Sequence, residues 1–381
     1  MRYTSEHNYT HDRQAKLGIL ITNLGTPDAP TAAALKPYLA EFLWDPRIVE
    51  PPPPRAIWWL ILHGIILRLR PKAKAHDYAS IWGKFGAGSP LLDITQAQAE
   101  GIRQRLQAAF NAPIEIEVGM RYGNPSMASA LDGLRQKGCE RLLVLPLYPQ
   151  YAAATTGSTW DALADALTLW RRVPDVRFVS HYHKHTGYIR ALANSVREYW
   201  DTHGKPDKLL MSFHGIPQRY LDNGDAYHCE CHATGRLLAE ALGLNKNEYL
   251  VSFQSLFGKE EWIKPYTDMT IKSLPAQGVK TLHVICPGFS ADCLETVEEI
   301  DVENRGYFME AGGENFHYIP ALNSRNDHLD ALTDVIKQHA QGWVETENFN
   351  AQSNATERAT TLARAKEMGC LECQPFFVQG I

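Results

Sequence analysis

Short apolar and β-branched runs alternate along most of the chain with longer stretches whose apolar residues follow a helical spacing. Strands that alternate with helices in this way are typical of a parallel sheet with crossover helices. Eight strands are expected, four in each half of the chain, at Gly18–Asn23, Ile114–Met120, Leu142–Leu147, Val176–Ser180, Lys208–Phe213, Tyr249–Phe253, Thr281–Cys286 and Phe316–Ala321. Helices are expected between them, for example at Leu92–Phe110, Ser126–Lys137, Tyr188–Thr202 and Ala233–Leu242.

The two sets of strands resemble diverged copies of one unit. The first strand of one set ends in Asn-Leu-Gly-Thr-Pro27, and that of the other ends in Phe-His-Gly-Ile-Pro217. Leu-Pro-Leu-Tyr148 likewise resembles Ile-Cys-Pro-Gly-Phe289. We therefore expect an α/β fold of two similar Rossmann-like lobes, each a four-stranded parallel sheet flanked by helices. A cleft between them would be lined by the carboxyl ends of both sheets, where open α/β folds place ligands.

The pattern also indicates where each lobe begins and ends. The first lobe is expected at 16–185 and the second at 186–324, and a helix at about 325–343 is expected to join the first lobe. The first lobe carries an additional apolar and basic segment before Leu92, which the second lobe lacks.

Residues 344–381 differ in character from the rest of the chain. Glu345–Asn354 is mostly polar and is expected to be a linker, and Ala355–Met368 is expected to form a helix. The tail that follows contains Cys370 and Cys373.

Composition narrows the class of protein. The chain has 381 residues, and its 38 basic and 43 acidic residues give a net charge of −5. This charge argues against a nucleic-acid binder, because no basic excess is available to neutralise phosphates. Seven cysteines are too few for a disulfide framework, and the N-terminal residues lack the apolar core of a signal peptide. We therefore expect a protein of the cytoplasm.

The longest apolar run is Ala56–Leu67, which His63 and Gly64 interrupt. It is shorter than the roughly 20 residues that a membrane-spanning helix needs. Pro51–Pro54 precedes it and several basic residues follow it. Two interpretations stay open. The run is either a buried helix, or an exposed apolar lip that rests on the inner face of the cell membrane or admits an apolar substrate.

Common nucleotide and nucleophile motifs are missing. No G-x-G-x-x-G follows the first strand, and the sequence contains neither a Walker A loop nor a G-x-S-x-G elbow. A dehydrogenase, a kinase and an α/β-hydrolase are therefore disfavoured. The strand ends carry His214 instead, directly after the strand Lys208–Phe213. An imidazole there can accept a proton or bind a divalent metal, although it can also simply hydrogen-bond a turn.

Three glutamates, Glu295, Glu299 and Glu303, recur every four residues after the seventh strand. On a helix they share one face, where like charges repel by a few tenths of a kcal/mol per pair. Such a row suits the handling of cations or protons, although a solvated acidic face is an alternative. A second alternative is that Glu295 forms a capping box with Asp292. Aromatic and cationic residues also collect near strand ends, which together suggest a flat aromatic ligand with anionic substituents: Arg121, Tyr122, Tyr148, Tyr151, Trp262 and Phe289.

These features together resemble the ferrochelatase family, whose members insert ferrous iron into a porphyrin. The resemblance covers roughly residues 17–340, through Gly18–Pro27, Gly88–Pro90, Arg121-Tyr122, Tyr148–Tyr151, Thr155–Gly157, Ser212–Pro217, Gly224-Asp225, Trp262 and Phe289–Asp301. It implies two Rossmann-like lobes with the porphyrin between them, and the C-terminal part of the chain packed on the first lobe. The implied reaction inserts Fe2+ into protoporphyrin IX to give protohaem, with release of two protons, as the last step of haem biosynthesis.

The resemblance also implies roles for individual residues. His214 and Glu295 would be the catalytic and metal-binding pair, and we expect them to come from the two halves and meet across the slit. Glu299 and Glu303 would form an acidic relay that leads away from the pocket. The positions around the macrocycle would be Leu24, Arg121, Tyr122, Tyr151, Trp262 and Phe289. Leu24 stands where some relatives, chiefly those that act on coproporphyrin, have a tyrosine, which favours protoporphyrin as the substrate.

The cysteines match the family only in part. Animal members hold a [2Fe–2S] cluster through a C-terminal C-x-x-C, one cysteine after it and one in a loop of the first lobe. Cys370-x-x-Cys373 resembles the first part, but no cysteine follows and Ala153 occupies the loop position. Cys229 and Cys231 would complete a four-thiolate site for [2Fe–2S] or zinc if the tail folds back onto the second lobe. Unliganded thiols are the alternative.

Two other functions use the same features. A non-catalytic haem or porphyrin carrier needs the aromatic walls but not the base and the acidic row. A chelatase for cobalt or nickel shares the fold and differs only in the ion.

Overall fold

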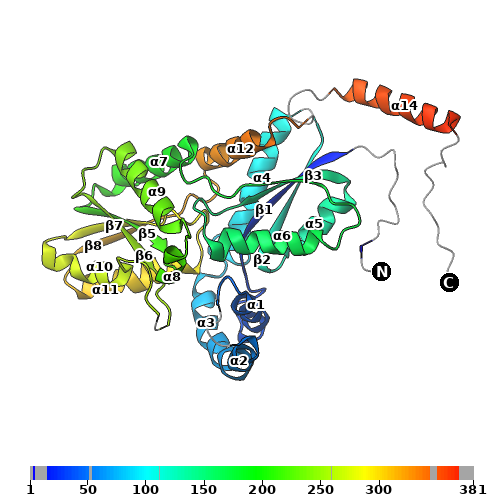
Figure 1. The fold of residues 1–381 in the computed structure, drawn as a ribbon. Helices are drawn as coiled ribbons and strands as arrows, with labels where there is room; N and C mark the ends of the chain where they lie inside the picture. The colour runs from blue at the N-terminus through cyan, green and yellow to red at the C-terminus, as the bar shows by residue number, and fades with distance from the viewer. Residues whose placement is uncertain are drawn as a thin grey trace.

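Two four-stranded parallel sheets form the centre of the molecule, one in each of the two lobes that lie side by side in Figure 1. The computed structural model describes residues 3–4, 15–50, 54–110, 112–258, 260–343 and 350–368. The strands of the first sheet are Lys16–Thr26 (β1), Ile114–Gly123 (β2), Cys139–Pro146 (β3) and Asp175–Phe178 (β4). Those of the second are Lys208–His214 (β5), Tyr249–Gln254 (β6), Thr281–Ile285 (β7) and Asn315–Ile319 (β8).

The two sheets have the same topology. Their strand orders are β2-β1-β3-β4 and β6-β5-β7-β8, so each strand of one lobe has a counterpart in the other. All pairs are parallel. The eight predicted strands and the internal repeat are therefore confirmed. The central strands are buried on both faces, as the fully buried Leu17, Ile19 and Leu20 of β1 illustrate, because helices cover both sides of each sheet.

The helices around the first sheet arise from ordinary local signals. Pro90 opens α4 (Pro90–Ala109) at a position where its missing N–H costs nothing, and Ile94, Ile102 and Leu106 form the buried face of this helix. The helices α5 (Met127–Gln136) and α6 (Ser158–Leu167) also pack in the first lobe. A short π-helical segment, η2 (Ala153–Gly157), precedes α6.

Helices of the second lobe surround its sheet in the same manner. They are α7 (Thr186–His203), α8 (Gln218–Asp222), α9 (Tyr227–Leu242), α10 (Thr267–Ser273) and α11 (Arg305–Glu310), with the 3-10 turn η3 (Pro275–Gln277). A ten-residue π-helical segment, η4 (Glu295–Asn304), follows β7 and runs into α11. The helices predicted in the two lobes are confirmed.

The helix α12 (Asn326–Ala340) lies where the two lobes meet. It packs on α4 and β3 of the first lobe and on α7. Gln98 of α4 also bonds to the segment that precedes α12. Its Nε2 donates to the carbonyl oxygens of Ser290, at 2.9 Å, and of Asn323, at 3.1 Å. Helix α12 therefore contacts the first lobe, as expected, while the lobe boundaries at 185 and 324 stay a prediction.

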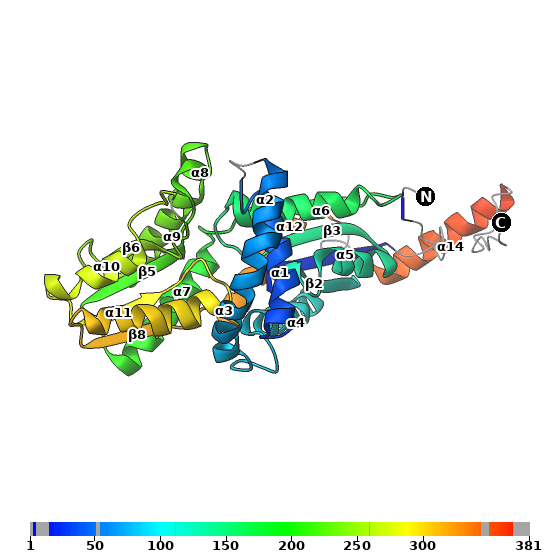
Figure 2. The same ribbon diagram turned by 90° about the horizontal axis from the view of Figure 1, so that it is seen from below.

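An insertion between β1 and α4 projects from the first lobe beside this junction (Figures 1 and 2). It consists of α1 (Ala32–Trp44), α2 (Arg55–Ile61), the π-helical η1 (Leu62–Ile66) and α3 (Leu67–Ile81). Large apolar side chains are exposed along it: Ile57, Trp59, Leu60, Ile65 and Leu69. The interpretation of Ala56–Leu67 as a wholly buried helix is therefore wrong, because only part of it, including Leu62, packs inward. Within the described residues, none of the helices combines the length and apolar character needed to cross a membrane.

The last described helix, α14 (Ala351–Glu367), stands apart from the lobes (Figure 1). It begins four residues earlier than the expected Ala355, because Asn350 caps it by accepting a hydrogen bond from the Ser353 amide. The end of the predicted linker, Glu345–Asn354, is therefore helical. Cys370 and Cys373 lie outside the described residues.

Candidate active site

His214 and Glu295 both come from the second lobe. His214 is the last residue of β5, and Glu295 opens η4 after β7. Because β5 and β7 are neighbouring parallel strands, the segments that follow them start from the same edge of the sheet. The expectation that the pair comes from two halves of the chain is therefore wrong, since adjacency within one sheet places them at the same edge.

A backbone carbonyl fixes the His214 ring. Its Nδ1 lies 2.7 Å from the Gly215 oxygen, and because a carbonyl can only accept, Nδ1 carries the hydrogen. Nε2 is then the nitrogen with the free lone pair. The indole of Trp262 lies beside it, with the two ring centroids 6.3 Å apart. Gly215 makes this packing possible, because a Cβ there would lie 2.9 Å from both the indole and the Gln254 oxygen.

A buried glutamine links β5, β6 and the start of η4. Gln254 donates from Nε2 to the backbone oxygen of Glu295, at 2.8 Å, and accepts at Oε1 from Ser212, at 2.7 Å. The Glu295 backbone is therefore held by a side chain of the neighbouring strand. Sequence reasoning missed Gln254, and only the strand pairing identifies it.

The predicted capping box does not form. The carboxylate of Asp292 accepts hydrogen bonds from Tyr318, at 2.6 Å, and from Asn323, at 2.7 Å. Its backbone N–H donates to Asn323, at 2.8 Å, instead of to Glu295. The capping alternative for Glu295 is therefore wrong, because Asp292 binds Asn323, in the loop between β8 and α12, instead of Glu295.

The acidic row runs from two half-buried glutamates, Glu295 and Glu299, to the exposed Glu303. Ser255 donates to Glu299 at 2.6 Å. Burial raises the pKa of Glu299, the Ser255 hydroxyl and the nearby His214 lower it, and the charge of Glu295 raises it, with a net increase. Glu303, one turn further along, is exposed and accepts a hydrogen bond from Tyr307. The three carboxylates thus lead outward from His214, along a π-helical segment of a kind frequent at functional sites.

The insertion supplies side chains that face Glu295 from the first lobe. Burial raises the pKa of Tyr38 in α1 and of Tyr78 in α3, and the charge of Glu295 raises both further. Lys74 of α3 donates to Asp77 at 2.8 Å and also lies within the field of Glu295. None of these residues was predicted, because no sequence pattern indicates that α3 packs on η4, as it does.

Three of the residues expected around the macrocycle are half-buried and apolar: Leu24, Trp262 and Phe289. Leu24 lies near the carboxyl end of β1 and packs, with Phe289, against the small core around Ala291 and Cys293. It thereby brings the end of β1 to the second lobe. The structure therefore places Leu24 and Phe289 together, and Trp262 beside His214.

Arg121 and Tyr122 are held by buried polar partners. Asp45 forms an ion pair with Arg121 and accepts from the Tyr122 hydroxyl at 2.8 Å, and Ser158 accepts from Arg121 at 2.6 Å. Tyr122 is fully buried. Tyr151 is half-buried, and its backbone N–H donates to the carboxylate of Glu230 at 2.7 Å. Arg121 and Tyr122 therefore share one polar network around Asp45, whereas Tyr151 has a separate partner in Glu230. The sequence revealed neither set of partners.

The described cysteines do not fit a thiolate cluster. Cys229 and Cys231 stand two residues apart on α9, and residues at that spacing do not share a helix face. Cys229 is exposed whereas Cys231 is fully buried, and burial raises the pKa of Cys231 well above its usual value. The two sulfurs therefore do not present a common site to the tail.

Comparison with known proteins gives the family. The sequence model of the family described as Ferrochelatase matches residues 16–340. The Ferrochelatase of Hydrogenovibrio crunogenus is 61% identical over 368 residues, which cover 97% of this chain and 97% of the relative. That of Thioalkalivibrio sulfidiphilus is 56% identical over 369 residues, which cover 97% of this chain and 99% of the relative.

Solved structures show the same fold. SirB from Bacillus subtilis with Fe3+ has a TM-score of 0.52 at 12% identity, covering 87% of this chain and 100% of that one. DR2241 from Deinococcus radiodurans, described as similar in structure to chelatases, has a TM-score of 0.51 at 13% identity, covering 93% of this chain and 61% of that one. With the family match and the close relatives, these observations lead to one conclusion: the chain belongs to the ferrochelatase family.

Proposed function

We propose that the chain inserts Fe2+ into protoporphyrin IX to give protohaem and two protons, with His214 and Glu295 as the catalytic pair. The observation that carries the proposal is the position of His214 at the end of β5, with Glu295 and Glu299 on η4, the segment that follows the neighbouring strand β7. A free-base porphyrin is planar, and its two inner N–H groups exclude a metal. The site must therefore remove two protons and pass an ion into the ring, which is work for a base and a row of carboxylates.

His214 is proposed to accept a pyrrole proton at Nε2. The hydrogen bond from Nδ1 to the Gly215 oxygen selects this tautomer and fixes the ring plane. Glu299 is suited to receive a proton next, because its raised pKa lets it carry one more readily than an exposed carboxylate. Glu303 at the surface would then exchange it with water.

The same two side chains are proposed to guide the metal. Imidazole and carboxylate can replace the water ligands of Fe2+ one at a time, whereas thiolates would hold the ion too tightly. Cys293 lies close to Glu295, but burial and the charge of Glu295 raise the pKa of its thiol well above the usual value. It therefore stays protonated and does not compete for the iron.

The apolar strand ends are proposed to hold the macrocycle. Leu24, Tyr151, Trp262 and Phe289 would contact the ring, while Arg121 and Tyr122 would support the first-lobe side through Asp45 and Ser158. Bending a porphyrin costs a few kcal/mol, which contacts around its periphery can supply from binding energy. The apolar Leu24 favours protoporphyrin over a more carboxylated ring. The proposal includes no [2Fe–2S] cluster, since Cys229 and Cys231 do not present a shared site.

The decisive experiment is incubation of the protein with protoporphyrin IX and Fe2+ while the porphyrin fluorescence is followed. The protein is expected to quench the fluorescence by forming haem, and Co2+ and Ni2+ in parallel reactions measure metal preference. The H214A variant is expected to bind porphyrin and to lose insertion. Insertion at an undiminished rate by H214A would exclude the role given to His214. Porphyrin binding without insertion by the unaltered protein would indicate a carrier instead.

We also propose that the apolar lip Ala56–Leu67 makes peripheral membrane contact. Ile57, Trp59 and Leu60 expose their side chains on one projecting element, and Arg68 and Arg70 follow it. Apolar side chains with a basic flank are typical of segments that lie on an anionic membrane surface. Flotation with anionic liposomes tests this, because the W59S/L60S variant should bind less than the unaltered protein. Equal flotation of the two would contradict the contact.

A further inference from the structure

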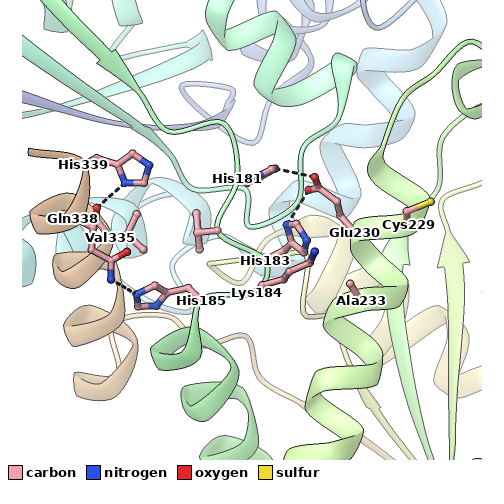
Figure 3. Close-up of a pocket in the computed structure, with 11 residues that line it drawn as sticks. His181, His183, Lys184, His185, Cys229, Glu230, Ala233, Val335, Gln338 and His339 are labelled. Carbon is pink, nitrogen blue, oxygen red and sulfur yellow. Dashed lines mark hydrogen bonds and ion pairs between the residues drawn. The ribbon is translucent and has the colours of Figure 1, made fainter.

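A second group of metal-binding side chains lies outside the candidate active site. The loop between β4 and α7, helix α9 and helix α12 enclose a pocket of about 380 Å³ (Figure 3). His181 and His183 of the loop and Glu230 of α9 point toward one another in it (Figure 3). No part of the proposed insertion reaction uses these side chains.

The three side chains have the geometry of a group that could hold a metal ion. His181 donates from Nδ1 to one carboxylate oxygen of Glu230, at 2.8 Å, and His183 Nδ1 lies 3.1 Å from the other. One ligand atom from each residue lies within 4.8 Å of those of the other two. Ligands of a tetrahedral ion with bonds of about 2.0–2.1 Å lie about 3.3 Å apart, so small side-chain rotations suffice.

The histidine on the inner side lacks the partners that a buried ring requires. The side chain of His183 is only 6% exposed, yet neither of its nitrogens makes a well-aligned hydrogen bond within the described residues. Leaving such groups unsatisfied costs free energy, and native structures seldom do so. A metal ion bound at the ring would remove this deficit.

Glu230 is prepared to act as an anionic ligand. Burial raises the pKa of its carboxyl group, but the two imidazoles and the Tyr151 amide lower it by more, so the net pKa falls. The backbone N–H of Tyr151 donates to Oε2 at 2.7 Å, and this bond fixes the carboxylate between the histidines. Orienting bonds of this kind are a regular feature of metal sites.

We propose that His181, His183 and Glu230 bind a divalent transition-metal ion, of which Zn2+ is the type, at a resident site separate from the site of iron insertion. Two imidazoles and one carboxylate suit such an ion, whereas Mg2+ and Ca2+ prefer oxygen ligands alone. Other histidines of the pocket are bound elsewhere: His185 pairs with Asp334 at 3.0 Å, and His339 donates to the Val335 oxygen at 2.9 Å.

The position of the site indicates what the ion does. The histidines follow β4 of the first sheet, whereas Glu230 belongs to α9, which packs on β6 of the second. An ion held by all three ties the lobes together. It also braces the segment at Tyr151, whose amide is bound by the same carboxylate. The ion is structural, because no substrate group of the proposed reaction needs to reach it.

The test is Zn2+ binding by the full chain after chelation of all metal, measured by calorimetry and by metal analysis after dialysis. H183A and H181A should each lose one equivalent of Zn2+ or bind it more than about 100-fold more weakly. The matched control is H339A, which changes a histidine of the same pocket that is not a ligand and should bind like the unaltered protein. H181A guards against misfolding, since its side chain is 49% exposed.

Two further measurements identify the ligands and the ion. X-ray absorption at the zinc edge should show nitrogen and oxygen neighbours with an imidazole signature. A parallel titration with Fe2+ under anaerobic conditions shows whether iron binds at the same residues. Unchanged zinc stoichiometry in both H181A and H183A would overturn the proposal. An X-ray absorption spectrum with sulfur neighbours around the bound zinc would also overturn it. Because zinc binding is measured without porphyrin, its failure leaves the proposed insertion reaction untouched.

Discussion

The two lobes share a scaffold but carry different chemistry at their strand ends. The strand orders correspond, and each lobe places a π-helical segment, η2 or η4, after its third strand. In the second lobe these ends bear His214, Glu295 and Glu299. In the first, the apolar Leu24 lies near the carboxyl end of β1, and Asp45 binds the polar groups of Arg121 and Tyr122. Under the proposed function, the duplicated fold therefore assigns proton and metal handling to one lobe and the apolar wall to the other.

Two glycines near the carboxyl ends of the central strands, Gly25 within β1 and Gly215 just after β5, show how the scaffold was kept while the chemistry changed. Gly25 has a φ of 109°, and a Cβ there would lie 1.8 Å from the Tyr122 oxygen. Gly215 lets Trp262 and the Gln254 backbone approach closely. Each lobe thus needs a glycine directly after this residue of its central strand for tight packing. The residue before the glycine, Leu24 or His214, gives the strand end its apolar or its imidazole side chain.

The largest expected effect tests the acidic side of the second lobe. E295Q keeps the size of the side chain but removes a negative charge at the sheet edge that carries His214, so the rate of iron insertion should fall by about 10²–10⁴-fold. E303Q is the control, since Glu303 stands on the same segment but is exposed, and it should change the rate by less than about tenfold. Initial rates of haem formation measure both. Equal losses would mean that Glu295, at the half-buried end of the row, has no special role.

The next effect, on stability, tests the first lobe. Asp45 is buried, and burial tends to raise its pKa, but Ser158, the Arg47 amide, Tyr122 and Arg121 lower it overall. D45A leaves Arg121 without its partner and should reduce the free energy of unfolding by about 3–5 kcal/mol. Urea unfolding measures this. The control D161A removes the exposed pair with Arg47 and should cost at most about 1 kcal/mol.

D45A also separates the roles of the lobes. Per folded molecule, it should lower the insertion rate far less than E295Q does. A loss of rate as large as that of E295Q, in protein shown to be folded, would contradict the division between a chemical lobe and a supporting lobe.

A smaller effect concerns the junction of the lobes and depends on pH. His328, at the start of α12, is fully buried and donates from Nδ1 to the Asn323 oxygen at 2.8 Å. Burial lowers its pKa to about 4, below the 6.5 of an exposed histidine. The unfolded chain therefore binds the proton more tightly, so stability is complete above about pH 6.5 and falls as the pH drops toward 4.

At pH 5 this one histidine should cost about 2 kcal/mol relative to pH 7. H328Q keeps a donor for Asn323 but does not titrate, so its stability should fall less steeply between these pH values. Urea unfolding at pH 7 and pH 5 gives the two slopes. The same pH dependence in both proteins would show that another group controls acid unfolding at the junction.

The features that the sequence predicted correctly are those that depend on hydrophobic periodicity and on local motifs. Eight strands, the repeat and the position of His214 after β5 follow from short apolar runs and the residues that end them. The origin of the His214–Glu295 pair did not follow, because strand order, which makes β5 and β7 neighbours, is not written in any local pattern. The same reason explains why the sequence did not predict Tyr38, Tyr78 and Gln254. Each comes near Glu295 only through long-range packing, and the local sequence around each is that of an ordinary helix or strand.

The smallest expected effect tests the apolar wall. Leu24 is half-buried and packs near Phe289, so L24A removes contact area without removing any polar group. Loss of about two to three buried methylene equivalents from a partly exposed site weakens binding by about 1–1.5 kcal/mol, so KM for protoporphyrin should rise roughly five- to tenfold. The kcat should stay within about twofold, because the base and carboxylates of the second lobe are unchanged. L169A, at an exposed leucine after α6, is the control and should leave both constants unchanged. A kcat that falls with KM constant would place Leu24 in the chemical step and remove the contrast between the lobes.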